Sequence, residues 1–412
     1  MKPKKSNPNY ISAADARRIA RENRKITDEM TKRFNRKDCQ ESEYLTTMKN
    51  PENVVEFDDL HASFYTDIGT VKAVDGVSFD IPIGKTVGVV GESGCGKSVT
   101  SLSLMQLLQR PQGQVVKGEI RLNLGDKAYD VAKMTGAAMQ KVRGNVVSMI
   151  FQEPMTSLNP VFRIGAQVDE VIALHGAEKL SVNYKHTKET KDTGKTSHTV
   201  EMKVETRKEL IKKRTIDMLN LVGIANAEGV YDMYPHELSG GMRQRVMIAM
   251  ALACDPQIII ADEPTTALDV TIQAQILDLL RGLKDKINSS IMLITHDLGV
   301  IAEMADYVVV MYAGRIVERG TVHDIFEAPS HPYTIGLMES KPVLNKKVER
   351  LYSIPGKVPN PVDMPDYCYF RDRCERQDRC GGRCEGAYPP EYKLSGTHGV
   401  ACYCYAKEDD AQ

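Results

Sequence analysis

The residues most able to do chemistry form a glycine-rich loop that could bind phosphate. The loop reads Gly91-Glu92-Ser93-Gly94-Cys95-Gly96-Lys97-Ser98-Val99. It follows an apolar β-like run, Thr86 to Val90, and opens a helix-compatible stretch, so its N–H groups and the positive end of the helix would face an anion. This spacing predicts that Lys97 reaches the β and γ phosphates of a nucleotide and that the Ser98 hydroxyl binds Mg²⁺.

A second candidate is an apolar run that ends in two carboxylates. Ile258 to Ala261 read as a buried strand, and Asp262 and Glu263 follow directly. In that arrangement Asp262 would support Mg²⁺ and Glu263 would face an attacking water. A buried strand with an exposed acidic end would give the same pattern by itself, but the phosphate-binding loop upstream favours the catalytic interpretation.

A third candidate is a helix start that could also bind an anion. The sequence reads Leu238-Ser239-Gly240-Gly241-Met242, which puts a hydroxyl and two glycine amides before an expected helix. The helix dipole favours an anion at that end. One nucleotide cannot contact both this helix start and the loop at Gly91 within one subunit, whereas two subunits arranged head to tail allow it. We therefore expect a dimer with ATP in its interface.

Length, charge and apolar runs narrow the class of protein. The chain has 412 residues, enough for two or three domains, and a formal net charge of -1, which gives no support to a nucleic-acid partner. No apolar run approaches the roughly 20 residues needed to span a bilayer. Residues 1–50 are basic but lack the apolar stretch of a secretory signal. These features indicate a cytoplasmic location.

The elements that must position these motifs alternate between strand and helix, which predicts a largely parallel sheet covered on both faces. Besides the two strands above, we expect strands at Val54–Leu60, Val77–Ile81, Val146–Phe151, Ile291–Thr295 and Tyr307–Tyr312, and helices at Gly241–Ala253, Thr271–Leu283 and Gly299–Ala305.

Two segments lack such a pattern. Residues 1–50 are polar, with a helix-compatible stretch over residues 13–36, and are interpreted as a solvated extension or as a helix that docks on a partner or on an anionic membrane surface. Residues 178–208 contain almost no large apolar side chains, so they are expected to be a flexible insertion.

The motifs and their order resemble the ATP-binding subunits of ABC transporters, in which the LSGG-type sequence is the family signature. The resemblance implies that Gln152 is the Q-loop glutamine, which binds Mg²⁺ and couples the nucleotide to a membrane partner, and that Ala267-Leu268-Asp269 is the D-loop. It also implies that His296 contacts the γ phosphate. An aromatic residue before the glycine loop stacks on adenine in relatives, and Tyr65 and Phe64 both fit that place.

The resemblance narrows to the oligopeptide and dipeptide importer subgroup, which also contains nickel importers. Three stretches and the cysteine-bearing tail carry it: Ala73 to Phe79, Phe151 to Pro160, and His331 to Thr334. It implies an α/β P-loop NTPase, a RecA-like ABC cassette with an antiparallel β subdomain. The expected division is an extension at 1–50, a cassette at 51–322 with a helical subdomain at about 159–238, and a small cysteine-rich C-terminal domain at 323–412.

The resemblance implies a function and a set of partners. The chain would be a peripheral ATPase at the cytoplasmic face of the cell membrane that drives peptide uptake. Its partners would be a second ABC ATPase subunit, two membrane permease subunits and an extracytoplasmic solute-binding protein, with no nucleic acid. Two alternatives stay open. The first is the same kind of ATPase subunit with nickel or another small solute as the transported cargo. The second is a soluble ABC ATPase that has no role in transport.

Six of the nine cysteines lie close together near the C-terminus, in a segment too poor in aliphatic residues to fold around its own core. A metal bound by thiolates would supply the missing constraint. Some members of the resembled subgroup carry a [4Fe-4S] cluster there, which would fall on Cys368, Cys374, Cys384 and Cys402, with Cys380 as the alternative third ligand. Four thiolates could equally hold zinc. A redox-sensing role is a further possibility.

Overall fold

The computed structural model describes residues 12–153, 157–176, 206–266, 269–340, 352–362 and 364–406, and it divides into two compact units. The first unit comprises Met1–Gln140 and Met292–Gln412, and the second comprises Lys141–Ile291. Most of the expected insertion at 178–208 lies outside the described residues. Its last two residues begin the helix Arg207–Leu221.

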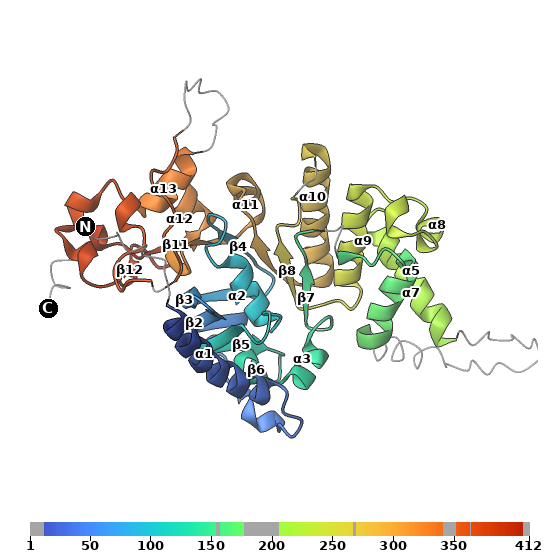
Figure 1. Ribbon diagram of the computed structural model, residues 1–412. Coiled ribbons are helices and arrows are strands. Elements are labelled where there is room, and N and C mark those ends of the chain that lie inside the picture. Colours follow the sequence, from blue (N-terminus) through green and yellow to red (C-terminus); the bar gives the residue numbers. More distant parts are fainter. Residues whose placement is uncertain are drawn as a thin grey trace, which may run out of the picture. The chain divides into compact units, whose positions relative to one another are not determined.

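The first unit contains an antiparallel sheet in the strand order β1-β6-β5-β2-β3 (Figure 1). Its strands are β1 (Leu45–Thr46), β2 (Asn53–Thr66), β3 (Gly69–Pro82), β5 (Gly113–Asn123) and β6 (Ala128–Asp130). Buried apolar residues on β2 and β3 form the core of this sheet, and the rings of Phe57 and Phe79 stack with centroids 4.5 Å apart. The antiparallel β subdomain expected from the resemblance is therefore present.

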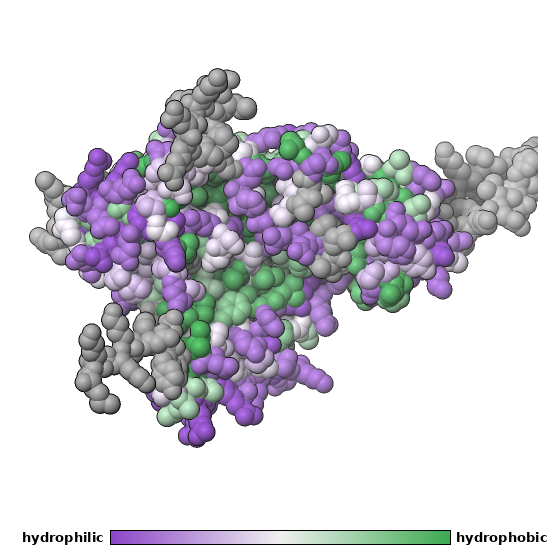
Figure 2. Space-filling model, turned by 45° about the horizontal axis from the view of Figure 1, so that its top comes forward, coloured by the Kyte–Doolittle hydropathy of each residue, from purple (hydrophilic) through white to green (hydrophobic). Residues whose placement is uncertain are grey.

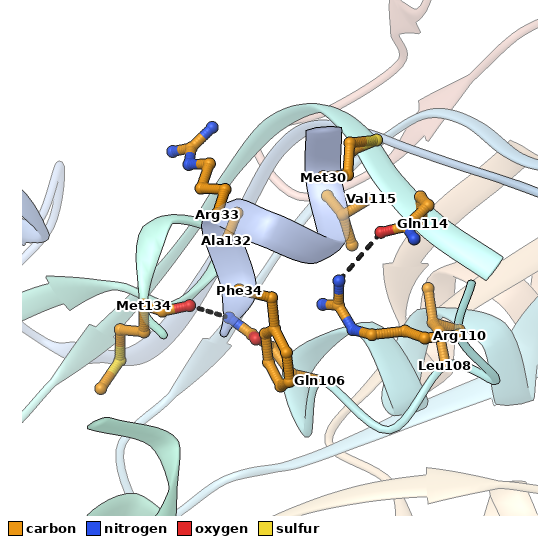
Figure 3. Close-up of a pocket in the computed structure, with 10 residues that line it drawn as sticks. All are labelled: Met30, Arg33, Phe34, Gln106, Leu108, Arg110, Gln114, Val115, Ala132 and Met134. Atoms are coloured by element: carbon orange, nitrogen blue, oxygen red, sulfur yellow. Dashed lines mark hydrogen bonds between the residues drawn. The ribbon is translucent and has the colours of Figure 1, made fainter. Parts of the chain in front are cut away.

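Helix α1 (Ala13–Phe34) packs on this sheet rather than extending into solvent alone. The Ser12 side chain caps its first turn, and the Asn23 side chain donates a hydrogen bond to the Thr66 carbonyl at 3.0 Å. At its last turn the Phe34 ring lies under the Arg110 guanidinium, 3.8 Å from the ring centroid, in the pocket of Figure 3. The helical stretch predicted at 13–36 is confirmed. Its last two turns contribute Met30 and Phe34 to a pocket that Leu108 and Val115 also line, so this end of the helix packs on the first unit.

A second sheet in the first unit carries the glycine loop. Its strands run in the order β12, β13, β11, β10, β4 and β9, where β9 (Ser290–Ile294) begins with two residues of the second unit. Strand β4 (Thr86–Val90) is fully buried and pairs in parallel with β10 (Tyr307–Tyr312). Strands β11 (Arg315–Thr321), β13 (Gly399–Val400) and β12 (Tyr392–Lys393) extend the sheet with antiparallel pairs. The predicted parallel core is confirmed, and its antiparallel edge is an addition.

Helices and short turns complete the first unit. The helices are α2 (Lys97–Leu104), α3 (Gly136–Val142, which ends in the second unit), α11 (Leu298–Met304), α12 (Val322–Glu327) and α13 (Pro332–Glu339). Single 3₁₀ turns lie at Glu41–Glu43, Val131–Lys133, Arg371–Arg373, Gln377–Cys380, Arg383–Glu385 and Tyr403–Tyr405. The cysteine-bearing segment joins the sheet where Glu318 pairs with Val400 and the Ala401 N–H donates to the Val317 carbonyl at 2.8 Å.

The second unit is a strand pair covered by helices. Strands β7 (Val147–Ile150) and β8 (Ile258–Asp262) pair in parallel. The helices are α5 (Ile164–Val171), α7 (Arg207–Leu221), α8 (Ala227–Tyr231), α9 (Gly240–Leu252) and α10 (Val270–Ile287), with a π-helical turn at Ile172–Gly176 and a 3₁₀ turn at Pro235–Glu237. The Asp169 carboxylate accepts from Thr215 at 2.5 Å and from the Tyr231 hydroxyl at 2.6 Å, which ties α5, α7 and α8 together (Figure 1).

The surface is mainly hydrophilic on the face shown in Figure 2, with separate hydrophobic patches. Within the ranges that the structure describes, no helix combines the length and the apolar composition that crossing a membrane requires.

Candidate nucleotide site

The glycine loop has the backbone shape of a phosphate cradle. Gly91 and Gly96 have φ values of +152° and +99°, and a side chain at either place would collide with backbone. A Cβ on Gly91 would lie 2.1 Å from the Met311 carbonyl oxygen, and one on Gly96 would lie 2.4 Å from that of Ala73. These two glycines are therefore required by the fold as well as by a ligand.

The loop leads directly into α2, as the sequence predicts. Lys97 and Ser98 are the first two residues of that helix, Val99 is the third, and the left-handed Gly96 is its N-cap. The Lys97 ammonium is buried and donates to the carbonyl oxygens of Gly91 at 2.7 Å and Glu92 at 3.0 Å. Beside Gly94 the space that a Cβ would enter is open within 4 Å. The loop thus presents helix-start N–H groups and a cation, which is the chemistry that a triphosphate needs.

Cys95 fills the inside of the loop. Its thiol is buried and lies 3.7 Å from the Lys97 ammonium nitrogen. Burial raises the pKa of Cys95 above its usual value, although the nearby ammonium opposes the shift. The thiol is therefore a packing group and a poor nucleophile at neutral pH.

Glu92 is held by two residues that no sequence motif marks as site residues. Arg373 donates to both of its carboxylate oxygens, at 2.7 and 3.1 Å, and the Tyr333 hydroxyl accepts the Glu92 backbone N–H at 2.7 Å. Both partners lie more than 240 positions away in the chain. Tyr333 lies within the His331 to Thr334 stretch noted above, but nothing in the sequence pattern links that stretch to the loop.

His296 lies at the same edge of the sheet as the loop. It follows β9, and the N–H of the preceding residue, Thr295, donates to the Val89 carbonyl on β4 at 3.3 Å. Its side chain is exposed. The first unit therefore brings the loop and the histidine to neighbouring strand ends, as the order of the motifs suggests.

Phe64 and Tyr65 are adjacent on β2, so their side chains point to opposite faces of the strand. The Phe64 ring lies against the backbone of Gly113, where a Cβ would come within 2.7 Å of it. The Tyr65 ring is half-buried, and that burial raises the pKa of its hydroxyl. Phe64 is thus committed to packing within the sheet.

In the second unit, Gln152 and Glu263 are in direct contact. The Gln152 amide donates to the Glu263 carboxylate at 2.8 Å, and the Thr266 hydroxyl donates to the same oxygen at 2.9 Å. Glu263 follows β8 with a φ of +46°, an uncommon conformation for a residue with a side chain, and such outliers gather at functional sites. Asp262, the last residue of β8, is 5% exposed.

The signature segment begins helix α9 as expected. Leu238 is buried and Ser239 is exposed, and the Ser239 hydroxyl caps the helix by accepting from the Met242 N–H at 3.3 Å. Gly240 and Gly241 form the first turn, where a Cβ on Gly240 would meet nothing within 4 Å. An accessible helix start with a capping hydroxyl can receive an anion from outside the unit.

The expected D-loop lies partly outside the described residues, which do not include Ala267 and Leu268. Asp269 caps α10 by accepting from the Ile272 N–H at 2.9 Å, and Val270 beside it is 83% exposed. The buried Gln244 of α9 donates to the Pro264 carbonyl at 2.5 Å. That bond links the signature helix to the segment that follows Glu263.

Five of the six tail cysteines line one small cavity: Cys368, Cys374, Cys384, Cys402 and Cys404. Among the described residues, the lining of that cavity does not include Cys380, whose thiol donates to the Gln377 carbonyl at 2.9 Å. Burial raises the pKa of Cys368 to about 11 and also raises that of Cys374, Cys384 and Cys402. Within the part of the chain that the structure describes, no three acidic, histidine or cysteine side chains are already grouped as a metal site requires.

Comparison with known proteins agrees with these motifs. A family model described as ABC transporter matches residues 74–266, and one described as the C-terminal region of oligopeptide/dipeptide transporters matches residues 317–380. The fold resembles the dimeric ATP-binding cassette MJ0796 bound to ADP and phosphate, at 23% identity and a TM-score of 0.50 over 65% of this chain and 98% of that one. It also resembles cbiO1 from Clostridium perfringens, at 24% identity and a TM-score of 0.51 over 67% and 92%.

Two relatives from Bacillus subtilis are similar over almost their whole length. The oligopeptide transport ATP-binding protein AppD is 45% identical over 87% of this chain and 99% of its own. The dipeptide transport ATP-binding protein DppD is 44% identical over 85% and 95%. The chain therefore belongs to the family of ATP-binding subunits of oligopeptide and dipeptide ABC transporters, and it is an ATPase that uses ATP and Mg²⁺.

Proposed function

We propose that this ATPase energises the uptake of oligopeptides or dipeptides through separate membrane permease subunits. The observation that carries the proposal is the similarity to peptide transport ATP-binding proteins over both the cassette and the C-terminal region. The relatives are named for oligopeptide and dipeptide transport, which favours peptides over nickel as cargo, and the C-terminal match favours a transporter over a soluble ABC ATPase.

In the second unit the proposed base is Glu263, which would orient or deprotonate the attacking water. Gln152 and Thr266 both hold its carboxylate, so the side chain is already fixed before a nucleotide arrives. Asp262, at the buried end of β8, and Gln152 are the proposed Mg²⁺ ligands of this unit.

In the first unit Lys97 and His296 would stabilise the charge that develops on the γ phosphate. Ser98, at the start of α2, is the proposed Mg²⁺ ligand of this unit. Bound at this site, Mg²⁺ would supply charge neutralisation for the triphosphate. Tyr65 is the preferred adenine-stacking residue, because the Phe64 ring already packs against Gly113.

The active form would be a head-to-tail dimer in which the Ser239 helix start of one ATPase faces the nucleotide on the Gly91 loop of the other. The exposed Ser239 hydroxyl and the highly exposed Val270 beside Asp269 support an interface there. Whether the second ATPase is another copy or a similar subunit, the geometry of the proposal is the same.

The membrane partners would be two permease subunits at the cytoplasmic face of the membrane, served by an extracytoplasmic solute-binding protein. Val161 and Phe162, which follow Gln152 in the second unit, are 71% and 56% exposed. Large exposed apolar side chains mark surfaces that contact other molecules. We assign this surface to the permease.

A thiolate-bound metal belongs to the same proposal. The four cysteines named for it, Cys368, Cys374, Cys384 and Cys402, share one cavity, and their raised pKa values mean that a cation would offset the cost of ionising them. A [4Fe-4S] cluster there would supply a cross-link for a segment with few aliphatic residues, and zinc would do the same. Iron, sulfide and zinc analysis of protein purified without oxygen separates the two.

The experiment that tests the proposal is reconstitution. The chain is purified from its host with the proteins that accompany it, and the complex is placed in liposomes with ATP inside. ATP-dependent uptake of labelled oligopeptides or dipeptides supports the proposal. Uptake of Ni²⁺ in place of peptides would move the assignment to the alternative cargo, and purification without any membrane subunit would argue against transport.

A further inference from the structure

Two parts of the C-terminal region contact the phosphate-binding loop at Glu92: Arg373, in the cysteine-bearing segment (residues 368–404), binds the side chain, and Tyr333, on helix α13, binds the backbone. Arg373 makes a two-pronged contact with the carboxylate, at 2.7 and 3.1 Å, and the Tyr333 hydroxyl holds the N–H at 2.7 Å. All three residues belong to the first unit. The second residue of the loop is thus fixed by chain that lies 241 to 281 positions downstream.

Arg373 is itself held in place. Its side chain is 5% exposed, and its Nε donates to the Pro355 carbonyl at 2.8 Å while Nη1 also approaches the Tyr312 hydroxyl at 3.3 Å. The rings of Tyr312, Tyr333 and Phe370 pack on one another with centroids 4.7 to 5.5 Å apart. The guanidinium carbon of Arg373 lies 5.7 Å from the Tyr312 centroid and 5.8 Å from the Phe370 centroid. A guanidinium in a fixed fork is well suited to a carboxylate, and its burial makes the pairing costly to lose.

The charge on Glu92 gives this contact a consequence for ATP. The loop binds an anion, so an uncompensated carboxylate within it would repel the triphosphate. Arg373 neutralises that carboxylate and also keeps the loop in its wrapped conformation before the nucleotide arrives, which lowers the ordering cost of binding. Cys374 follows Arg373 directly and lines the cysteine cavity.

We propose that Arg373 is a positioning residue for ATP binding, which neutralises and fixes Glu92 and so makes the affinity for ATP depend on the folded cysteine-bearing segment. The inference concerns the ATP site and holds whichever solute is transported. It gives the C-terminal segment a role in the nucleotide cycle beyond any metal that it holds.

The first test is Arg373→Met in the full-length chain, with the ATPase measured in the purified transporter. We expect binding of a fluorescent ATP analogue to weaken about tenfold and KM for ATP to rise similarly, with kcat at saturating ATP changed less than about twofold. The matched control is Arg371→Met, because Arg371 lies on the same 3₁₀ turn and pairs with Glu385 instead. The control should bind ATP as the wild type does.

The second test separates this role from a merely structural one. If the harm in Arg373→Met comes from an uncompensated Glu92, the double variant with Glu92→Gln should bind ATP more tightly than Arg373→Met alone. Arg373→Lys, which keeps the charge and loses the fork, should fall between wild type and Arg373→Met. Should Arg373→Met fail to fold, Arg373→Lys is compared with and without Glu92→Gln. Unchanged ATP affinity in the single variant, or no recovery in the double variant, overturns the proposal.

Discussion

The phosphate-binding loop and the signature segment both prepare a helix start for an anion, but different parts of the chain hold them. The loop at Glu92 depends on Tyr333 and Arg373, far downstream in the sequence. The signature segment is held mainly by neighbours: Ser239 caps Met242 three residues on, and Glu237 caps the Tyr234 N–H at 2.7 Å. Only the bond from Gln244 to Pro264 reaches further among the contacts described above.

This difference predicts which of the two sites responds to a structural change elsewhere in the chain. A helix start held by its own sequence neighbours keeps its shape when distant parts of the chain loosen. A loop that is held by contacts with the C-terminal region loses its shape when that region loosens. Disturbing the cysteine-bearing segment should therefore change nucleotide binding at the loop and leave the signature helix as it was.

The largest effect expected is on chemistry, in the second unit. Glu263→Gln keeps the size of the side chain and the contact with Gln152 but removes the base, so steady-state ATP hydrolysis should fall about a thousandfold. ATP binding should persist, and the variant should accumulate as an ATP-bound dimer in size-exclusion chromatography. Glu228→Gln, on the exposed side of α8, is the matched control and should turn over ATP normally. Near-normal hydrolysis in Glu263→Gln would remove that residue from its assigned role.

A second effect is expected on the stability of the first unit. Asp75 on β3 is buried and accepts from Arg315 at 2.7 and 2.9 Å and from the Tyr369 hydroxyl at 2.7 Å, so it joins the antiparallel sheet to the cysteine-bearing segment. Asp75→Asn should lower the free energy of unfolding by about 3 kcal/mol, because it leaves Arg315 without a counter-charge.

Amide hydrogen exchange shows which parts of the chain lose stability in Asp75→Asn. In Asp75→Asn the amides of the glycine loop should exchange faster, and those of α9 should exchange as in the wild type. Asp278→Asn breaks an exposed pair with Arg281 on α10 and should cost less than about 0.5 kcal/mol. Equal acceleration in the loop and in α9 would erase the distinction between the two regions.

A smaller effect is expected at the signature helix. Ser239→Ala removes the N-cap of α9 and should destabilise the second unit by about 1 kcal/mol. ATP binding by the single subunit should be unchanged, because the loop does not depend on that cap. Denaturation curves and ATP titration of the monomer check both parts, and weaker ATP binding by the monomer would contradict the proposed arrangement.

The smallest effect is a pH dependence in the first unit. The hydrogen bond to Asp75 raises the pKa of His61, burial opposes the shift, and the second ring nitrogen contacts Asp59. Because the folded pKa lies above the unfolded value of about 6.5, the stabilisation is complete below that pH and is lost as pH rises through the folded pKa. The Tm advantage of the wild type over His61→Asn should therefore shrink from pH 6 to pH 9, whereas a constant difference would contradict it.

The sequence predicted the parallel core well because its strands are continuous apolar runs. Strands β4 and β10 begin and end at the predicted residues, and the motifs at Gly91, Ser239 and Glu263 lie at the predicted element ends. Such features depend on residues that are close together in the sequence, so a short stretch is enough to predict them.

Two kinds of feature were not predicted from the sequence: strands that mix polar and apolar residues, and contacts between residues far apart in the chain. Strand β11 contains Arg315, Glu318 and Arg319, so it carries no simple apolar run, and β12 and β13 are two residues each. The docking of α1 through Phe34 and the grip of Arg373 on Glu92 join residues far apart in the chain. No periodicity in one segment can indicate such a partner.

If ATP hydrolysis by this chain drives the uptake of peptides, the reconstituted transporter must show both activities together. Labelled oligopeptides or dipeptides should accumulate only with ATP on the side of this subunit, and accumulation should stop in Glu263→Gln while ATP remains bound. Peptide uptake that continues undiminished in that variant, or a complex that hydrolyses ATP without moving any peptide, would contradict the account.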